Sequence, residues 1–147
     1  MSQFSDPVFQ SYVASVVVLS LNVLGLANAT AFTRNQHTEV INPEDKKLND
    51  AASVVYDEGN DKTQRYRRAH RNALENVPLF MITGLLFAMT GPGKTLAMAI
   101  FATFTVCRIA HSVCYVKAIQ PFRTMFFAFG MLTQVVMLGL IVWKVWF

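Results

Sequence analysis

The chain has 147 residues, 53% of them hydrophobic, and a formal net charge of +4. This length fits one domain, residues 1–147. The basic residues are interleaved with acidic residues and border long apolar blocks, which argues against a nucleic-acid-binding protein and in favour of a membrane protein.

Four apolar blocks predict four transmembrane helices, at residues 8–34, 62–90, 94–119 and 122–147. A helix needs about 20 apolar residues to cross the hydrocarbon core. The second block reaches this length only if the charged first turns of its helix stay at the membrane surface. We interpret the first block as a retained helix rather than a secretory signal, because no basic segment precedes it. Residues 35–61 form a polar loop. Because the other connections are short, the sequence predicts an all-α, up-down four-helix bundle.

The charges are concentrated in residues 34–76, which hold eight of the thirteen Lys and Arg and eight of the nine Asp and Glu. From Val77 onward the sequence has no acidic residue. The positive-inside rule places residues 34–76, and the loop with Lys117 and Arg123, on the cytoplasmic side. We therefore expect a multi-pass membrane protein whose candidate site faces the cytoplasm. An endoplasmic reticulum membrane and a bacterial inner membrane fit the sequence equally well.

The second helix begins with a run of charged residues. Arg68, Asn72 and Glu75 are spaced i, i+4 and i+7 and share one face, and Arg71 lies four residues before Glu75. One interpretation is that the arginines anchor the helix among lipid headgroups and that Arg71 pairs with Glu75. The other is a ligand-binding site, because a carboxylate so close to hydrocarbon is costly without a partner. The spacing alone favours neither interpretation.

The third helix carries a polar stripe at Arg108, His111, Ser112 and Tyr115, spaced i, i+3, i+4 and i+7. A lone histidine there would be a packing residue, but four polar groups in register indicate a site. Because the third and fourth helices contain no acidic residue, we expect Arg108 to pair with Glu75 or with an acidic ligand. No second His or Cys stands at ligand spacing, so we expect no metal site.

Arg123 follows Pro121 at the start of the fourth helix. Its guanidinium either anchors the helix at the membrane surface or, beside the positive end of the helix dipole, favours a bound anion such as a thiolate. With the second and third helices, this makes a strongly cationic region with one carboxylate near the cytoplasmic face. Such a region suits a small polyanionic ligand that also carries an ammonium group. Glutathione fits, because it has two carboxylates, one ammonium and one thiol.

Four motifs occur in one order: N-P-E-D at residues 42–45, R-R-A-H-R-N-A-L-E at 67–75, R-I-A-H-S-V-C-Y at 108–115 and P-F-R-T at 121–124. Together they resemble the MAPEG family, the membrane-associated proteins in eicosanoid and glutathione metabolism. They are most similar to the branch with microsomal glutathione transferase and prostaglandin E synthase. The resemblance implies a homotrimer of four-helix bundles, with glutathione bound between neighbouring subunits.

The resemblance also implies roles for individual residues. Arg123 would stabilise the glutathione thiolate as the main catalytic residue, and Asp45 and Thr124 occupy positions implicated in catalysis in the prostaglandin synthases. The family commonly has Asp where this chain has Ala73, a departure that affects the polar network of the second helix. The synthases have Ser where this chain has Thr124, so the P-F-R-T motif does not settle the branch. The expected glutathione-binding residues are Arg34, Arg68, His70, Arg71, Asn72, Glu75, Arg108, His111, Tyr115 and Arg123.

The sequence therefore predicts a membrane-bound glutathione transferase, active in detoxification, whose thiolate attacks hydrophobic electrophiles or lipid hydroperoxides arriving from the bilayer. One alternative is a glutathione-dependent isomerase of the prostaglandin E synthase type, which uses the same thiolate on an endoperoxide. Another is a non-catalytic membrane adaptor that binds a lipid or a partner protein. The residues do not name the acceptor substrate.

Overall fold

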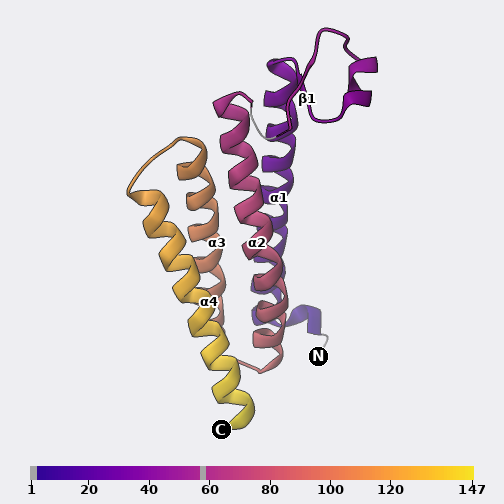
Figure 1. The fold of residues 1–147 in the computed structure, drawn as a ribbon. Helices are drawn as coiled ribbons and strands as arrows, with labels where there is room; N and C mark the ends of the chain where they lie inside the picture. Colours follow the sequence, from indigo (N-terminus) through magenta and orange to yellow (C-terminus); the bar gives the residue numbers. More distant parts are fainter. Residues whose placement is uncertain (1–2, 57–58) are drawn as a thin grey trace.

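The computed structural model describes residues 3–56 and 59–147, so residues 57 and 58 of the expected loop lie outside the described residues. After a short 3₁₀ helix, η1 (Gln3–Ser5), the long helices are α1 (Pro7–Gln36), α2 (Asp61–Met89), α3 (Lys94–Val116) and α4 (Phe122–Trp146) (Figure 1). Each of these four is long and apolar enough to cross a membrane. The expected all-α membrane fold is confirmed, and the chain is an integral, multi-pass membrane protein.

Local sequence sets the ends of the helices. Asp6 and Asn60 cap α1 and α2, because the side-chain oxygen of each accepts a backbone N–H from two residues ahead, at 3.1 and 2.9 Å. α3 ends earlier than expected, because Ala118 adopts a left-handed conformation with φ of 56°. The amide of Ile119 then donates to the carbonyl of Cys114 at 2.9 Å, which closes the end of the helix.

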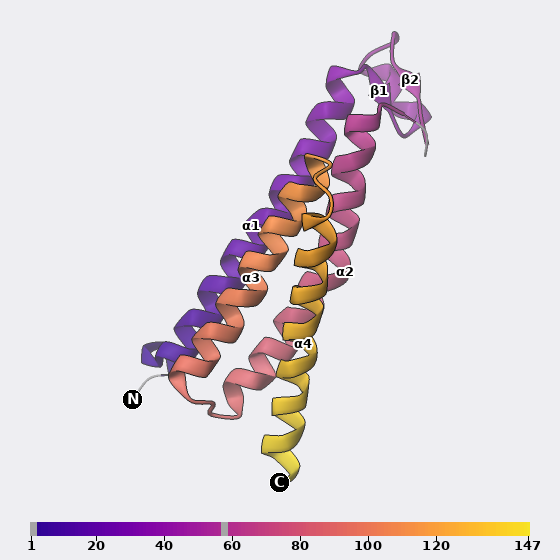
Figure 2. The same ribbon diagram turned by 90° about the vertical axis from the view of Figure 1, so that its left-hand side faces the viewer.

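The four helices run alternately up and down. Both termini and the α2–α3 turn lie at one end of the bundle, and the α1–α2 loop and the α3–α4 turn lie at the other (Figures 1 and 2). α1 packs against α2 and α3, and α4 packs against α3 and α2. In the part of the chain that the structure describes, α1 and α4 are not in contact. They are therefore opposite edges of the bundle, with α2 and α3 between them.

The loop between α1 and α2 is folded. It contains β1 (Glu39–Val40), η2 (Pro43–Lys47) and β2 (Ser53–Val54), and the two strands pair in parallel. The carboxylate of Glu39 accepts the backbone N–H of Asn60 at 2.7 Å, which ties the loop to the start of α2. This loop lies beside the C-terminal turns of α1, near the start of α2 (Figures 1 and 2). It adds a polar surface at this end of the helix bundle.

Aromatic side chains form much of the core of the bundle. Phe80 of α2 and Phe104 of α3 stack with their ring centroids 4.3 Å apart, and Phe101 meets Phe80 edge-on at 6.0 Å. The hydroxyl of Tyr12 in α1 donates to the carbonyl of Met81 in α2 at 2.8 Å. Since lipid tails are as apolar as these side chains, close van der Waals contact stabilises the bundle more than removal from water does.

We expect Gly84→Ala to loosen the contact between α1 and α2. A Cβ at Gly84 would lie 3.0 Å from a ring carbon of Tyr12, and this ring is held by its hydrogen bond to Met81. Overpacking of this kind costs about 1–3 kcal/mol, so unfolding in detergent should begin at a lower denaturant concentration. Gly139→Ala is the matched control, because a Cβ there meets no atom within 4 Å. Equal stability of the two variants would contradict the prediction.

Candidate functional site

Arg108 lies in the interior of the bundle, with only 2% of its surface exposed. Its Nη2 donates to the side-chain oxygen of Asn72 on α2. Its Nε and Nη1 have no hydrogen-bond partner among the described residues. Gly130 of α4 makes room for the side chain, because a Cβ there would lie 3.4 Å from Cδ of Arg108. α3 thus places a guanidinium with unused donors between α2 and α4.

His111 lies almost one helical turn further along α3 and is 4% exposed. Its Nδ1 is 2.9 Å from the backbone carbonyl oxygen of Arg123. A carbonyl oxygen only accepts hydrogen bonds, so in the neutral ring Nδ1 carries the proton and Nε2 is an acceptor. Within the described residues, the buried Nε2 has no partner. The ring therefore ties α3 to the first turn of α4 and offers one acceptor to a ligand.

Arg123 and Arg108 each lie over an aromatic ring. The guanidinium of Arg123 lies over the ring of Tyr115, 4.8 Å from its centroid, an arrangement that stabilises a cation. The ring of Phe127 is 5.6 Å from that of His111 and 5.9 Å from the guanidinium of Arg108. The structure thus brings together five of the expected site residues, which we call the cationic cluster: Asn72, Arg108, His111, Tyr115 and Arg123.

Glu75 lies outside this cluster. Its carboxylate is 3.3 Å from Nε of Arg71, and the side chains of Arg71 and Glu75 are 82% and 58% exposed. The expected pairing of Arg108 with Glu75 is therefore wrong within the chain, because α2 turns Asn72 rather than Glu75 toward α3. The exposed i, i+4 pair is what the headgroup-anchoring interpretation of α2 predicted. Such pairs contribute little to stability, typically about 0–1 kcal/mol.

Five other expected residues also lie apart from the cationic cluster. Arg68 and Thr124 are exposed, and His70 is half-buried. Arg34 and Asp45 line a cavity of about 720 Å³ between the end of α1 and the folded loop. Within the described residues, none of these five side chains forms a hydrogen bond or an ion pair with the cluster. A single chain therefore contains the predicted site in two separate parts.

Two polar pairs inside the bundle were not predicted from the sequence. Nε2 of Gln134 donates to Oγ1 of Thr83 at 2.5 Å, which joins α4 to α2. Nδ2 of Asn22 donates to Oγ of Ser112 at 3.1 Å, which joins α1 to α3. The sequence did show an amide side chain in each of two apolar blocks, and a buried amide is costly without a hydrogen bond. That pattern does not identify the partner.

Comparisons with known proteins confirm the resemblance seen in the motifs. The model of the MAPEG family matches residues 12–143, which include the whole cationic cluster. The chain is 33% identical to microsomal glutathione S-transferase 1 of Homo sapiens and to that of Mus musculus, in alignments that cover 85% of this chain and 83% of each relative. It is 26% identical to prostaglandin E synthase of Homo sapiens, over 95% of this chain and 91% of that protein.

Replacing Asn72 should destabilise the bundle, because it removes the hydrogen-bond partner of a buried cation. We expect Asn72→Leu to cost about 1–3 kcal/mol and Arg108→Met in the same background to recover most of this loss. Denaturant unfolding in detergent, analysed as a double-mutant cycle, measures the coupling. Arg71→Met, which breaks only an exposed pair, is the control and should change stability little. Additive effects of the Asn72 and Arg108 substitutions would show that the two side chains do not interact.

Proposed function

Since the chain belongs to the MAPEG family, we propose that it is a membrane-bound glutathione transferase that also reduces lipid hydroperoxides. Its thiol substrate is glutathione, and its second substrate is a hydrophobic electrophile that reaches the site from the bilayer. The similarity to microsomal glutathione S-transferase 1 of Homo sapiens, at 33% identity over 85% of the chain, supports this activity.

The observation that carries the proposal is the unbalanced positive charge of the cationic cluster. Two guanidinium nitrogens of Arg108 and Nε2 of His111 are buried without partners among the described residues. α3 and α4 contain no acidic residue. A buried cation is costly unless an anion or a full set of hydrogen bonds compensates it. The two carboxylates of glutathione would supply the negative charge, and its N–H groups would supply a donor to His111.

Arg123 is the residue that we assign to the glutathione sulfur. It lies in the first turn of α4, where the positive end of the helix dipole adds to the guanidinium charge. Nearby positive charge favours the thiolate over the thiol, and the thiolate is the nucleophile. The hydrogen bond between His111 and the carbonyl of Arg123 holds this turn against α3.

The same thiolate performs both proposed reactions. In transfer, the sulfur forms a bond to an electrophilic carbon, and the leaving group departs with the bonding electron pair. In peroxide reduction, the sulfur attacks the terminal peroxide oxygen and the O–O bond breaks. The alkoxide takes a proton and leaves as an alcohol, and the sulfur becomes a sulfenic acid. A second glutathione then converts the sulfenic acid to glutathione disulfide and water.

We propose that a neighbouring subunit of a homotrimer completes the site. Arg34 and Asp45 line a cavity at the end of α1, and α1 does not contact α4 in the described part of the chain. Arg71 and Glu75 lie on the exposed face of α2. The motifs imply that all of these residues contact one tripeptide. They can do so if Arg34 and Asp45 belong to an adjacent chain. Glu75 would then hold the ammonium of glutathione.

The proposed site faces the cytoplasm. Arg123 starts α4 at the end of the bundle that carries the α3–α4 turn and the folded loop (Figure 1). The positive-inside rule places this end in the cytoplasm, because it carries residues 34–76 with eight Lys and Arg. Glutathione is a cytosolic thiol and would enter from that side. The orientation is the same for an endoplasmic reticulum membrane and a bacterial inner membrane.

An isomerase of the prostaglandin E synthase type is the second candidate. The similarity to prostaglandin E synthase of Homo sapiens, at 26% identity over 95% of the chain, favours it, and the 33% identity to the transferase favours conjugation. Both candidates use the same thiolate, and the difference between them is the acceptor that the thiolate attacks. Steady-state assays with a chlorinated aromatic acceptor and with an endoperoxide separate the two activities.

Arg123→Ala should abolish formation of the thiolate. We expect glutathione added to the wild-type protein to produce the ultraviolet absorbance of a thiolate at neutral pH, and this band to be lost in Arg123→Ala. Turnover of a chlorinated aromatic acceptor should fall on the order of 10²-fold, the usual effect of removing one group that stabilises developing charge. Lys94→Ala, at the opposite end of the bundle, is the control. Unchanged absorbance and turnover in Arg123→Ala would show that Arg123 does not stabilise the thiolate, and the absence of both signals in the wild-type protein would favour the non-catalytic adaptor.

Co-expression of two inactive variants tests the sharing of the site between subunits. We expect Arg34→Ala and Arg123→Ala to be inactive alone but to regain part of the turnover when they are expressed together. A mixed trimer contains interfaces at which one chain supplies Arg34 and its neighbour supplies Arg123. Purification through two different affinity tags isolates the mixed oligomers. No recovery in the doubly tagged protein would place both arginines of one site in the same chain.

A further inference from the structure

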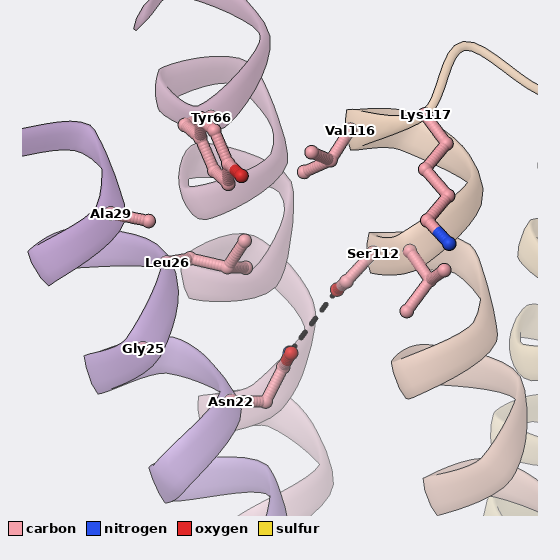
Figure 3. A pocket seen from close by; sticks show the side chains of 9 residues that line it. Asn22, Gly25, Leu26, Ala29, Tyr66, Ser112, Val116 and Lys117 are labelled. Carbon is pink, nitrogen blue, oxygen red and sulfur yellow. Dashed lines mark hydrogen bonds between the residues drawn. The ribbon is translucent and has the colours of Figure 1, made fainter. Parts of the chain in front are cut away.

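A second cavity lies on the side of the bundle away from α4. It is an open cavity with a volume of about 290 Å³, lined by residues of α1, α2 and α3 (Figure 3). Gly25 lies on its α1 side, and a Cβ at this position would meet no atom within 4 Å. Leu26, Ala29 and Val116 give it an apolar lining. We call it the α1–α3 groove.

Two linked hydrogen bonds lie at the floor of the α1–α3 groove. Nδ2 of Asn22 donates to Oγ of Ser112 at 3.1 Å, shown as the dashed line in Figure 3. Oγ of Ser112 in turn donates to the backbone carbonyl of Arg108 at 3.0 Å. These two polar side chains bond to each other and to the backbone, and the apolar lining above them suits a hydrocarbon chain.

One cation lies at the rim of the groove. Lys117 follows the last turn of α3, and its side chain folds back along the helix toward Ser112 (Figure 3). Tyr66 of α2 directs its hydroxyl into the same space. Lys117 has no ion pair within the described residues, and the sequence has no acidic residue from Val77 onward. The rim therefore offers an ammonium and a hydroxyl donor to a negatively charged group.

We propose that the α1–α3 groove binds a membrane phospholipid with an anionic headgroup. One acyl chain occupies the apolar space left by Gly25, and the phosphate binds Lys117 and the hydroxyl of Tyr66. A volume of about 290 Å³ equals that of the smallest ligand pockets, so the groove holds part of one chain and the bilayer holds the rest. The positive-inside orientation also places Lys117 in the leaflet that is richer in anionic lipids.

The lipid in this groove is not the substrate of the proposed reaction. Ser112 and Val116 line the groove, whereas His111 and Tyr115, each one residue earlier on α3, contact the first turns of α4. Successive residues of a helix point about 100° apart, so α3 separates the groove from Arg123. The inference therefore holds or fails independently of the proposed transferase activity.

Photolabelling with two lipid probes tests the proposal. The full-length protein is placed in phosphatidylcholine vesicles that contain phosphatidylglycerol or phosphatidylcholine with the same diazirine-bearing acyl chain, and the labelled peptides are identified by mass spectrometry. We expect the phosphatidylglycerol probe to label residues 22–29 and 112–117 preferentially. Gly25→Leu should remove this labelling, because its side chain fills the groove. Gly139→Leu, at a glycine with equally open surroundings on α4, should not.

Lys117→Gln tests the headgroup contact without filling the groove. We expect it to lower the preference for the phosphatidylglycerol probe over the phosphatidylcholine probe about fivefold, the usual effect of one basic residue at a membrane surface. Lys144→Gln, near the opposite end of the bundle, is the control. Even labelling of all lipid-facing helices, full labelling of Gly25→Leu, or an unchanged lipid preference in Lys117→Gln would each overturn the proposal.

Discussion

The burial of Arg108 inside a membrane-spanning bundle is the constraint on which the rest of the structure depends. A guanidinium that does not reach water needs an anion or hydrogen bonds, and among the described residues it donates one hydrogen bond, to the side-chain oxygen of Asn72. That bond joins α2 to α3, and Gly130 allows α4 to pack against the aliphatic part of the side chain. Three helices therefore meet around the cation.

The same burial separates positive charge from negative charge. Arg108 is inside the bundle, whereas Glu75 is on the outer face of α2 and is paired with Arg71. A protein arranged for stability alone would place an apolar side chain at Arg108 or a carboxylate beside it. Native proteins leave few buried polar groups without partners, and those few usually have a functional reason. The separation therefore supports the proposed site, which glutathione and a second subunit would complete.

The helices and the motifs could be predicted from the sequence, but the contacts between helices could not. Hydrophobic length is a property of a continuous segment, so all four spans could be predicted, and the i, i+3, i+7 spacing correctly grouped Arg108, His111 and Tyr115. The rotation of α2 depends on side chains of other helices, so the choice between Asn72 and Glu75 as the partner of Arg108 needed coordinates. The paired strands of the loop also depend on contacts between residues that are far apart in sequence.

α3 carries residues of both proposed ligand sites, the cationic cluster and the α1–α3 groove. Its residues 108, 111 and 115 face α2 and α4, and Ser112 and Val116 face α1. Oγ of Ser112 bonds the backbone carbonyl of Arg108, so the floor of the α1–α3 groove and the buried cation belong to the same helical turn. An i→i+4 hydrogen-bonded turn does not deform easily, and a lipid in the groove would act on the cationic cluster only by moving α3 as a rigid element.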